Sequence, residues 1–138
     1  MKWTSIFLFL VSLLACDDTT NLAISPAGQE HPGSVELIVL GNVQDAGSPH
    51  IACRKECCRE LFLKPDPSRQ VTALGLVDRA NEKSYLFEAS PDLPGQAKRL
   101  AKFANSNEEL PQGIFLTHAH IGHYTGLMYL GREATNAD

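Results

Sequence analysis

The chain has 138 residues, 12 Lys and Arg against 16 Asp and Glu, and a formal net charge of −4. Its composition, 43% hydrophobic and 20% charged, excludes an intrinsically disordered chain, and its length allows one domain or part of one. The mild negative charge gives no electrostatic reason to expect nucleic acid or an anionic membrane surface as a partner.

The first fifteen residues are typical of an export signal. Lys2 precedes an apolar run over residues 3–14, which is shorter than the ~20 residues that span a bilayer as a helix. The run ends in Leu-Leu-Ala and Cys16, and this pattern resembles a bacterial lipobox, in which the cysteine is lipidated. We expect residues 1–15 to be a lipoprotein signal peptide; an ordinary signal peptide and an uncleaved anchor are the alternatives.

Residues 16–34 contain Asp, Thr, Asn, Ser, Pro and Gly and few large apolar side chains. This composition predicts a flexible tether. With a lipid on Cys16, the tether would hold the remaining domain, residues 35–138, on a membrane face without a spanning helix. The expected location is therefore extracytoplasmic, as a membrane lipoprotein of the bacterial cell envelope.

The elements predicted after the tether are mixed. Runs of β-branched and apolar residues predict strands, helical spacing and Pro boundaries predict helices, and a short polar turn joins two strands into a hairpin. In chain order these are strand 34–40, helix 53–63, strand 71–77, strand 84–89, a helix after residue 92, strand 114–117 and helix 126–134. Their order indicates an α/β (α+β) fold with helices packed on a sheet.

The helix after residue 92 has the clearest periodicity. Its apolar positions, spaced 4, 3 and 4 residues apart, are Leu93, Ala97, Leu100 and Ala104. This spacing predicts one buried face. Three basic residues fall on or near the opposite face, which indicates a solvated surface; they are Lys98, Arg99 and Lys102.

Three cysteines follow the tether in the spacing Cys53-x3-Cys57-Cys58. An odd number in an oxidising compartment allows one disulfide and one free thiol. A structural zinc site is a second interpretation, in which His50 would be the fourth ligand. Three free or partly buried thiols are the third, and the spacing alone does not choose among them.

Three of the five histidines of the chain lie within six residues: His118, His120 and His123. Imidazole is the commonest metal-ligating side chain. Residues two apart at the end of a strand point to the same side, so His118 and His120 can reach one ion. A surface cluster without a ligand role is the alternative, but the spacing H-x-H-x-x-H between an apolar strand and a helix start favours a metal site.

Residues 117–126, T-H-A-H-I-G-H-Y-T-G, resemble the metallo-β-lactamase fold superfamily of metallo-hydrolases, whose motif is H-x-H-x-D-H at the end of a strand. The resemblance implies that His118 and His120 bind one zinc ion and that His123 belongs to a second metal position. Gly122 stands where the superfamily has Asp. Because glycine has no side chain to bind a metal, we expect one zinc ion and doubt the second.

A closer resemblance connects more of the chain to the branch that includes coenzyme PQQ biosynthesis protein B. It rests on residues 39–47 (VLGNVQDAG), on Pro-His at 49–50 with the cysteines that follow, and on residues 85–92 (YLFEASPD). The similar region runs from about residue 35 to residue 133. The cysteine spacing departs from that of the branch, so the structural zinc of the branch does not transfer.

Two aspartates in loops that follow predicted strands, Asp45 and Asp92, are candidates for the border of a pocket. Turn formation and helix capping are the alternative roles, since Asp commonly has both.

The resemblance implies a zinc-dependent hydrolase that acts on a small-molecule ester, amide, lactone or phosphoester. The superfamily domain is an αββα sandwich of two similar halves, and no His follows His123 in the sequence. We therefore expect this chain to be the N-terminal half of such a domain and to be inactive alone. The alternatives are a non-catalytic metal-binding or partner-binding lipoprotein and a role in cofactor biosynthesis.

Overall fold

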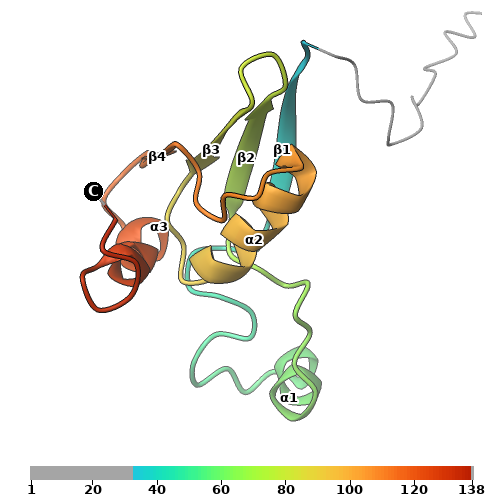
Figure 1. Ribbon diagram of the computed structural model, residues 1–138. Coiled ribbons are helices and arrows are strands. Elements are labelled where there is room, and N and C mark those ends of the chain that lie inside the picture. The colour runs from blue at the N-terminus through green and yellow to red at the C-terminus, as the bar shows by residue number, and fades with distance from the viewer. Residues whose placement is uncertain (1–32, 138) are drawn as a thin grey trace, which may run out of the picture.

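The computed structural model describes residues 33–137, which form one four-stranded sheet with helices beside it (Figure 1). The strands are β1 (Val35–Gly41), β2 (Ala73–Asp78), β3 (Lys83–Phe87) and β4 (Gly113–Phe115), in the order β1-β2-β3-β4. The first three are antiparallel neighbours, whereas β4 is parallel to β3. Helix α2 (Leu93–Ala104) makes the crossover that a parallel pair requires.

The predicted α+β fold class and the β2–β3 hairpin are confirmed. Asp78 fixes the turn of the hairpin, because its carboxylate accepts hydrogen bonds from the main-chain N–H groups of Ala80 and Asn81 and from the Asn81 side chain. The bonds from Asn81 hold the pKa of Asp78 below its ordinary value, since they favour the charged form.

One face of the sheet packs against α2 and forms the core. Its buried residues are Leu40, Ala73, Val77, Leu86, Ala89, Leu93 and Leu100. The predicted apolar positions of α2 supply Leu93 and Leu100, and burying one such side chain contributes about 1.5–3 kcal/mol. Gly75 of β2 permits the close approach of the helix, because a Cβ there would lie 2.6 Å from Leu100 Cδ1.

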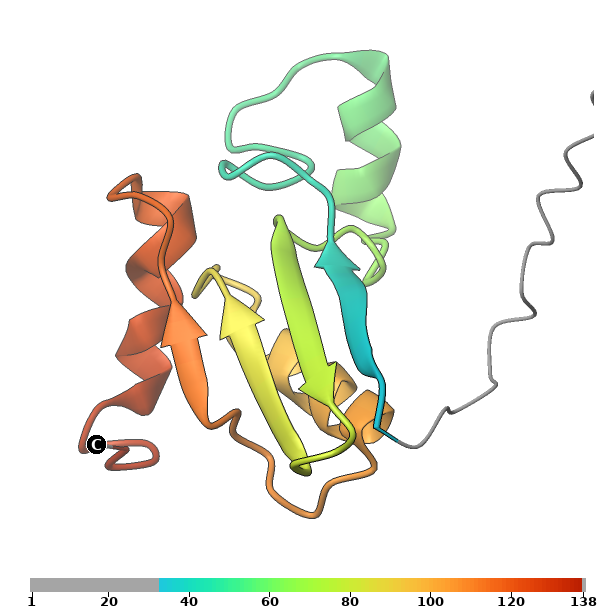
Figure 2. The same ribbon diagram turned by 90° about the horizontal axis from the view of Figure 1, so that it is seen from above.

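The opposite face of the sheet is apolar and exposed. Val35, Leu37 and Val39 of β1 are each between 60% and 64% exposed. Phe115 of β4 is 51% exposed, and its ring stacks on that of Phe87 at a centroid distance of 5.3 Å. In Figure 2 the helix α2 lies on the other side of the sheet, so the aliphatic and aromatic face remains uncovered among residues 33–137.

Helix α1 (Glu56–Leu63) lies away from the sheet in both views (Figures 1 and 2). It begins three residues later than the sequence predicts. The preceding segment instead turns through Ala52, whose φ is +61°, and the Cys53 N–H donates to the His50 carbonyl.

The helix predicted at 126–134 is wrong in position and type. The chain forms a short helix α3 (Ile121–Tyr124) followed by a 3₁₀ helix, η1 (Thr125–Leu130). The physical reason is tertiary hydrogen bonding: the Ala89 N–H donates to the His123 carbonyl, and the Gly126 N–H donates to the Ala89 carbonyl, each at 2.8 Å. These two groups are the ones that a continuous α-helix would use for its own i to i−4 bonds.

The predicted signal peptide, Cys16 and most of the predicted tether lie outside the described residues. Within residues 33–137, no helix is long and apolar enough to cross a membrane.

Candidate metal centre

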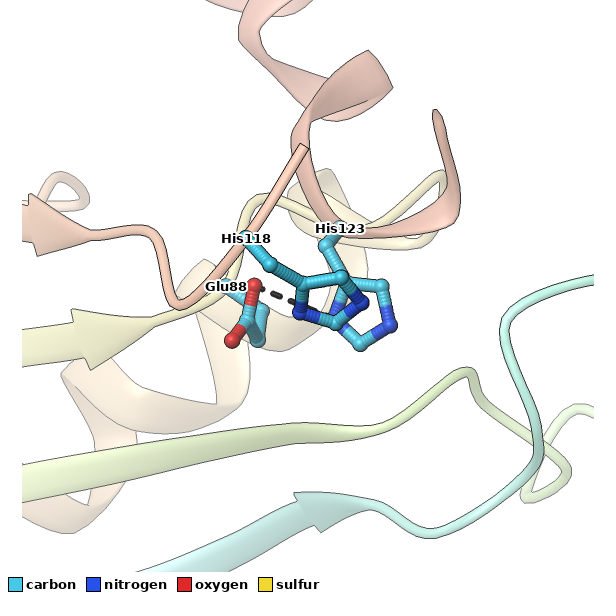
Figure 3. Close-up of side chains that lie close together, drawn as sticks. All are labelled: Glu88, His118 and His123. Carbon is cyan, nitrogen blue, oxygen red and sulfur yellow. Dashed lines mark ion pairs between the residues drawn. The ribbon is translucent and has the colours of Figure 1, made fainter. Parts of the chain in front are cut away.

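The ends of the parallel strands β3 and β4 bring Glu88 together with His118 and His123 (Figure 3). Glu88 directly follows β3, while His118 and His120 follow β4. His123 lies in α3, which comes next in the chain. Because the carboxyl ends of parallel strands meet at one edge of a sheet, side chains from separate parts of the sequence become neighbours there.

The imidazoles of His118 and His120 are in hydrogen-bonding contact. His118 Nε2 lies 3.0 Å from His120 Nδ1, and His118 Nδ1 lies 2.9 Å from the Thr117 hydroxyl oxygen. Two nitrogens that bind one tetrahedral zinc at 2.0–2.1 Å are about 3.3 Å apart. The geometry therefore suits a shared ion, with Thr117 orienting the ring of His118.

His123 and Glu88 form a second, more buried pair. His123 Nδ1 lies 3.1 Å from Glu88 Oε2, and the two side chains are 13% and 7% exposed. Despite this short distance, neither atom has a hydrogen bond of acceptable geometry among the described residues. The two atoms are therefore in close contact but are not aligned as a hydrogen bond. Buried polar atoms are normally hydrogen-bonded, so two such atoms without a hydrogen bond are uncommon and mark this contact as a candidate functional site.

Glu88 is held in place by the backbone around it. Its N–H donates to the Phe115 carbonyl at 2.8 Å, and its Oε1 accepts the Thr117 N–H at 3.2 Å. Its φ of +78° is uncommon for a residue other than glycine and costs about 1–3 kcal/mol. Such strained residues cluster at functional sites, and Glu88 is buried at the centre of this one.

Glu88, His118 and His123 each offer a donor atom within 4.8 Å of the others, which makes them a possible metal-binding group. The sequence reading missed Glu88, because it lay inside the predicted strand 84–89. The available signal was a carboxylate at the end of a buried strand, next in the sheet to the strand that leads into the histidines.

Asp92 lies elsewhere and is structural. Its carboxylate accepts the Val71 N–H at 2.8 Å, while Gln96 Nε2 donates to the Val71 carbonyl at 2.7 Å. Asp92 is the residue before α2, but its side chain makes no capping hydrogen bond, so the predicted capping role is wrong. Together Asp92 and Gln96 satisfy both backbone groups of Val71, as a neighbouring strand would.

The predicted cysteine cluster is also separate from the histidines. Cys53 and Cys58 form a disulfide, and Cys57 is an exposed free thiol. Of the three alternatives that the spacing left open, the structure has the one with a disulfide and a free thiol. None of the three cysteines belongs to a group of potential metal ligands within the described part of the chain.

No protein-family model matches this sequence, and no curated protein matches it. Solved structures do match. A diphosphatase from the PhnP family aligns with a TM-score of 0.51 and 23% identity over 76% of this chain. Zn²⁺-bound PqqB from Methylobacterium extorquens aligns with a TM-score of 0.51 and 22% identity over 72% of this chain. Both are metallo-β-lactamase fold proteins.

The chain has part of the metallo-β-lactamase fold. It spans about two-fifths of the two matched proteins, 39% of the diphosphatase chain and 37% of the PqqB chain. The expected resemblance to this fold is thereby confirmed, as the partial sandwich that the sequence predicts.

Asp45, a candidate site residue from the sequence, lies against Gly122, which stands where the metallo-β-lactamase motif usually has aspartate. Gly122 is buried in α3, and the backbone of Asp45 packs directly against it. The structure thus brings Asp45 to the histidine-bearing helix, in contrast to Asp92.

The residues at this edge fit a metal ion. The imidazole nitrogens and the Glu88 carboxylate are donor types that zinc accepts, and Glu88 Oε2 and His123 Nδ1 are buried without a hydrogen bond that would already occupy them. The carboxylate–imidazole contact is also the usual arrangement that orients a metal-binding histidine. Glu88, His118 and His123 could hold an ion together, and His120, 3.0 Å from His118, would lie beside it.

Proposed function

We propose that this chain is the metal-binding part of a zinc-dependent hydrolase of the metallo-β-lactamase fold. The observation that carries the proposal is the convergence of His118 Nε2 and His120 Nδ1 to 3.0 Å, beside the buried pair of Glu88 and His123. The Zn²⁺-bound state of the PqqB neighbour supports zinc as the ion.

Each residue at this edge of the sheet has its own role in the proposed site. His118 and His120 would bind the ion, Thr117 would orient His118 through their 2.9 Å contact, and Glu88 and His123 would lie beside the ion. A zinc ion held in this way lowers the pKa of a bound water to about 7 and polarises a carbonyl or phosphoryl oxygen. Both effects suit hydrolysis at neutral pH.

The proposed metal site does not by itself select one class of substrate. Esters, amides, lactones and phosphoesters are all hydrolysed by this chemistry. The neighbour from the PhnP family is a diphosphatase, which supports testing a phosphoester or diphosphate first. The chain spans about two-fifths of its structural neighbours, so the substrate of the whole protein is part of this proposal.

The location is a further part of the proposal. Cys16, after an apolar run that ends in Leu-Leu-Ala, supports a membrane-anchored lipoprotein of the cell envelope. Metabolic labelling with a tagged fatty acid tests this point. Label on the wild-type chain and its loss in Cys16→Ser are expected, whereas equal labelling of both would contradict lipidation at this residue.

The test of the hydrolase begins with the coding sequence after the Asp138 codon. The product of the complete reading frame that contains this chain is the protein to assay. Zinc-loaded product should hydrolyse one of the substrate classes, and the double variant His118→Ala/His120→Ala should lose at least about 100-fold of that rate. His50→Ala, a histidine in the loop before the disulfide, is the matched control and should keep the rate.

A product that binds zinc through His118 and His120 but hydrolyses no substrate class would contradict the hydrolase. It would favour the alternative, a non-catalytic metal-binding lipoprotein. A stop codon directly after Asp138 would exclude the hydrolase for this polypeptide and favour the same alternative.

A further inference from the structure

Residue 122 has no room for a side chain. A Cβ built on Gly122 would lie 2.5 Å from Asp45 Cβ and 2.9 Å from the Asp45 carbonyl carbon. Non-bonded carbon atoms do not approach so closely, and two of these neighbours are fixed parts of Asp45 rather than the far end of a flexible side chain. An aspartate at 122 is therefore excluded by the position of Asp45.

The backbone around Asp45 is well anchored. The N–H groups of Asn42 and Val43 donate to the Gln70 carbonyl, and the Thr72 N–H donates to the Val43 carbonyl. Beyond Asp45, the turn closes through a bond from the Gly47 N–H to the Gln44 carbonyl at 2.9 Å. Asp45 thus lies in a short loop that is tied to the sheet on one side and closed on itself on the other.

The carboxylate of Asp45 is available. Among residues 33–137 it makes no hydrogen bond or ion pair, unlike the carboxylate of Asp92, which is bonded to the Val71 N–H. Asp45 is partly buried, so its side chain is neither fully solvated nor used by the fold. The backbone of Asp45 lies against Gly122 of the histidine-bearing helix, and zinc accepts carboxylate oxygens, so this aspartate has the chemistry of a ligand.

We propose that Asp45 provides, from the loop after β1, the carboxylate ligand that residue 122 lacks, and that with His123 it forms a second divalent-cation position. This inference rests on the proposed function. Its basis is that Asp45 Cβ lies 2.5 Å from where the Cβ of residue 122 would lie. The side chain of Asp45 therefore starts from a point close to that of a side chain at residue 122, the residue before His123. With Nδ1 of His123 against Glu88, Nε2 is the nitrogen left for an ion.

The test is the zinc stoichiometry of the full chain, measured by elemental analysis after titration and checked by Co²⁺ absorption. Wild-type protein should bind two equivalents. Asp45→Asn, which keeps the shape of the side chain, should bind one tightly and the second at least tenfold more weakly, as loss of even an outer-shell partner costs about 10–100-fold. Asp66→Asn removes one negative charge in an exposed turn and should keep both equivalents.

The outcomes separate the two proposals. Equal stoichiometry and affinity in wild-type protein and Asp45→Asn, whether one or two ions bind, would overturn the role of Asp45 and leave the His118 and His120 site intact. Absence of any bound metal in wild-type protein would overturn both. If Asp66→Asn also lost the second zinc ion, the loss in Asp45→Asn would follow from net charge alone, and the assignment of Asp45 as a ligand would be overturned. Circular dichroism of each variant confirms that the fold is retained.

Discussion

His123 Nδ1 lies 3.1 Å from Glu88 Oε2, and both atoms are buried without a hydrogen bond of acceptable geometry. Glu88 comes from the end of β3 and His123 from α3, so this contact joins the two segments that form the candidate metal centre. A buried carboxylate is costly unless it is paired, and an adjacent cation or imidazolium compensates for it. The pair therefore explains why an ion would be stable at this edge of the sheet.

The substitution Glu88→Gln should weaken zinc binding. The amide keeps the size of the side chain and can still accept the Thr117 N–H, but it no longer supplies the negative charge beside His123. We expect the zinc affinity to fall about 10–100-fold, measured by competition with a chromophoric chelator. Glu109→Gln, an exposed residue paired with Lys98, is the control and should bind zinc as wild type does. Equal affinities for Glu88→Gln and wild type would show that Glu88 does not support the centre.

The substitution Gly122→Ala should destabilise the protein by about 1–3 kcal/mol, because the new methyl group meets the backbone of Asp45. Urea unfolding followed by circular dichroism measures the change. Gly113→Ala in β4 is the matched control, since a Cβ there has no neighbour closer than 3.5 Å, in the Tyr85 ring. Similar stabilities for the two variants would mean that loop 42–47 does not pack on α3 as described.

The substitution Leu100→Ala should cost about 2–5 kcal/mol of unfolding free energy, because Leu100 is 1% exposed in the core between α2 and the sheet. Phe103→Ala on the same helix is the comparison. Phe103 is 45% exposed, so its replacement should cost much less. Equal losses from the two variants in urea would contradict the packing of α2.

The open face of the sheet should make the chain prone to self-association. Exposed apolar faces and strand edges promote aggregation, and β1 presents Leu37 and Val39 at 64% and 60% exposure. The double variant Leu37→Lys/Val39→Lys should raise the monomer fraction in size-exclusion chromatography. Asn107→Lys/Thr135→Lys adds the same charge at two other exposed positions and should not. An equal rise in monomer fraction for both double variants would show that net charge, and not the exposed apolar face, controls self-association.

Local patterns predicted those parts of the fold that depend on neighbouring residues. The spacing of Leu93, Ala97 and Leu100 predicted α2, and the two apolar runs around a polar turn predicted the hairpin. The histidine spacing likewise predicted which side chains come together after β4. In these cases the decisive interactions lie within one element or between adjacent ones.

The features that the sequence did not reveal depend on distant contacts. Arg99 was expected on a solvated face, and this prediction is wrong. Its Nη1 donates hydrogen bonds to the Leu40 carbonyl at 2.8 Å and to Gln70 Oε1 at 3.2 Å. The 3₁₀ helix after α3 arises from bonds to Ala89, and the role of Glu88 arises from the pairing of β3 with β4. None of these partners can be identified from spacing along the chain.

The zinc content of the purified full chain tests the central claim most directly. Wild-type protein dialysed against trace zinc and analysed by elemental analysis should retain at least one equivalent, and His118→Ala/His120→Ala should retain about none at the paired site. His50→Ala, with the same loss of an imidazole outside the centre, should retain the wild-type content. Zinc retained equally by the double variant and wild type would show that His118 and His120, although 3.0 Å apart, do not form the metal site.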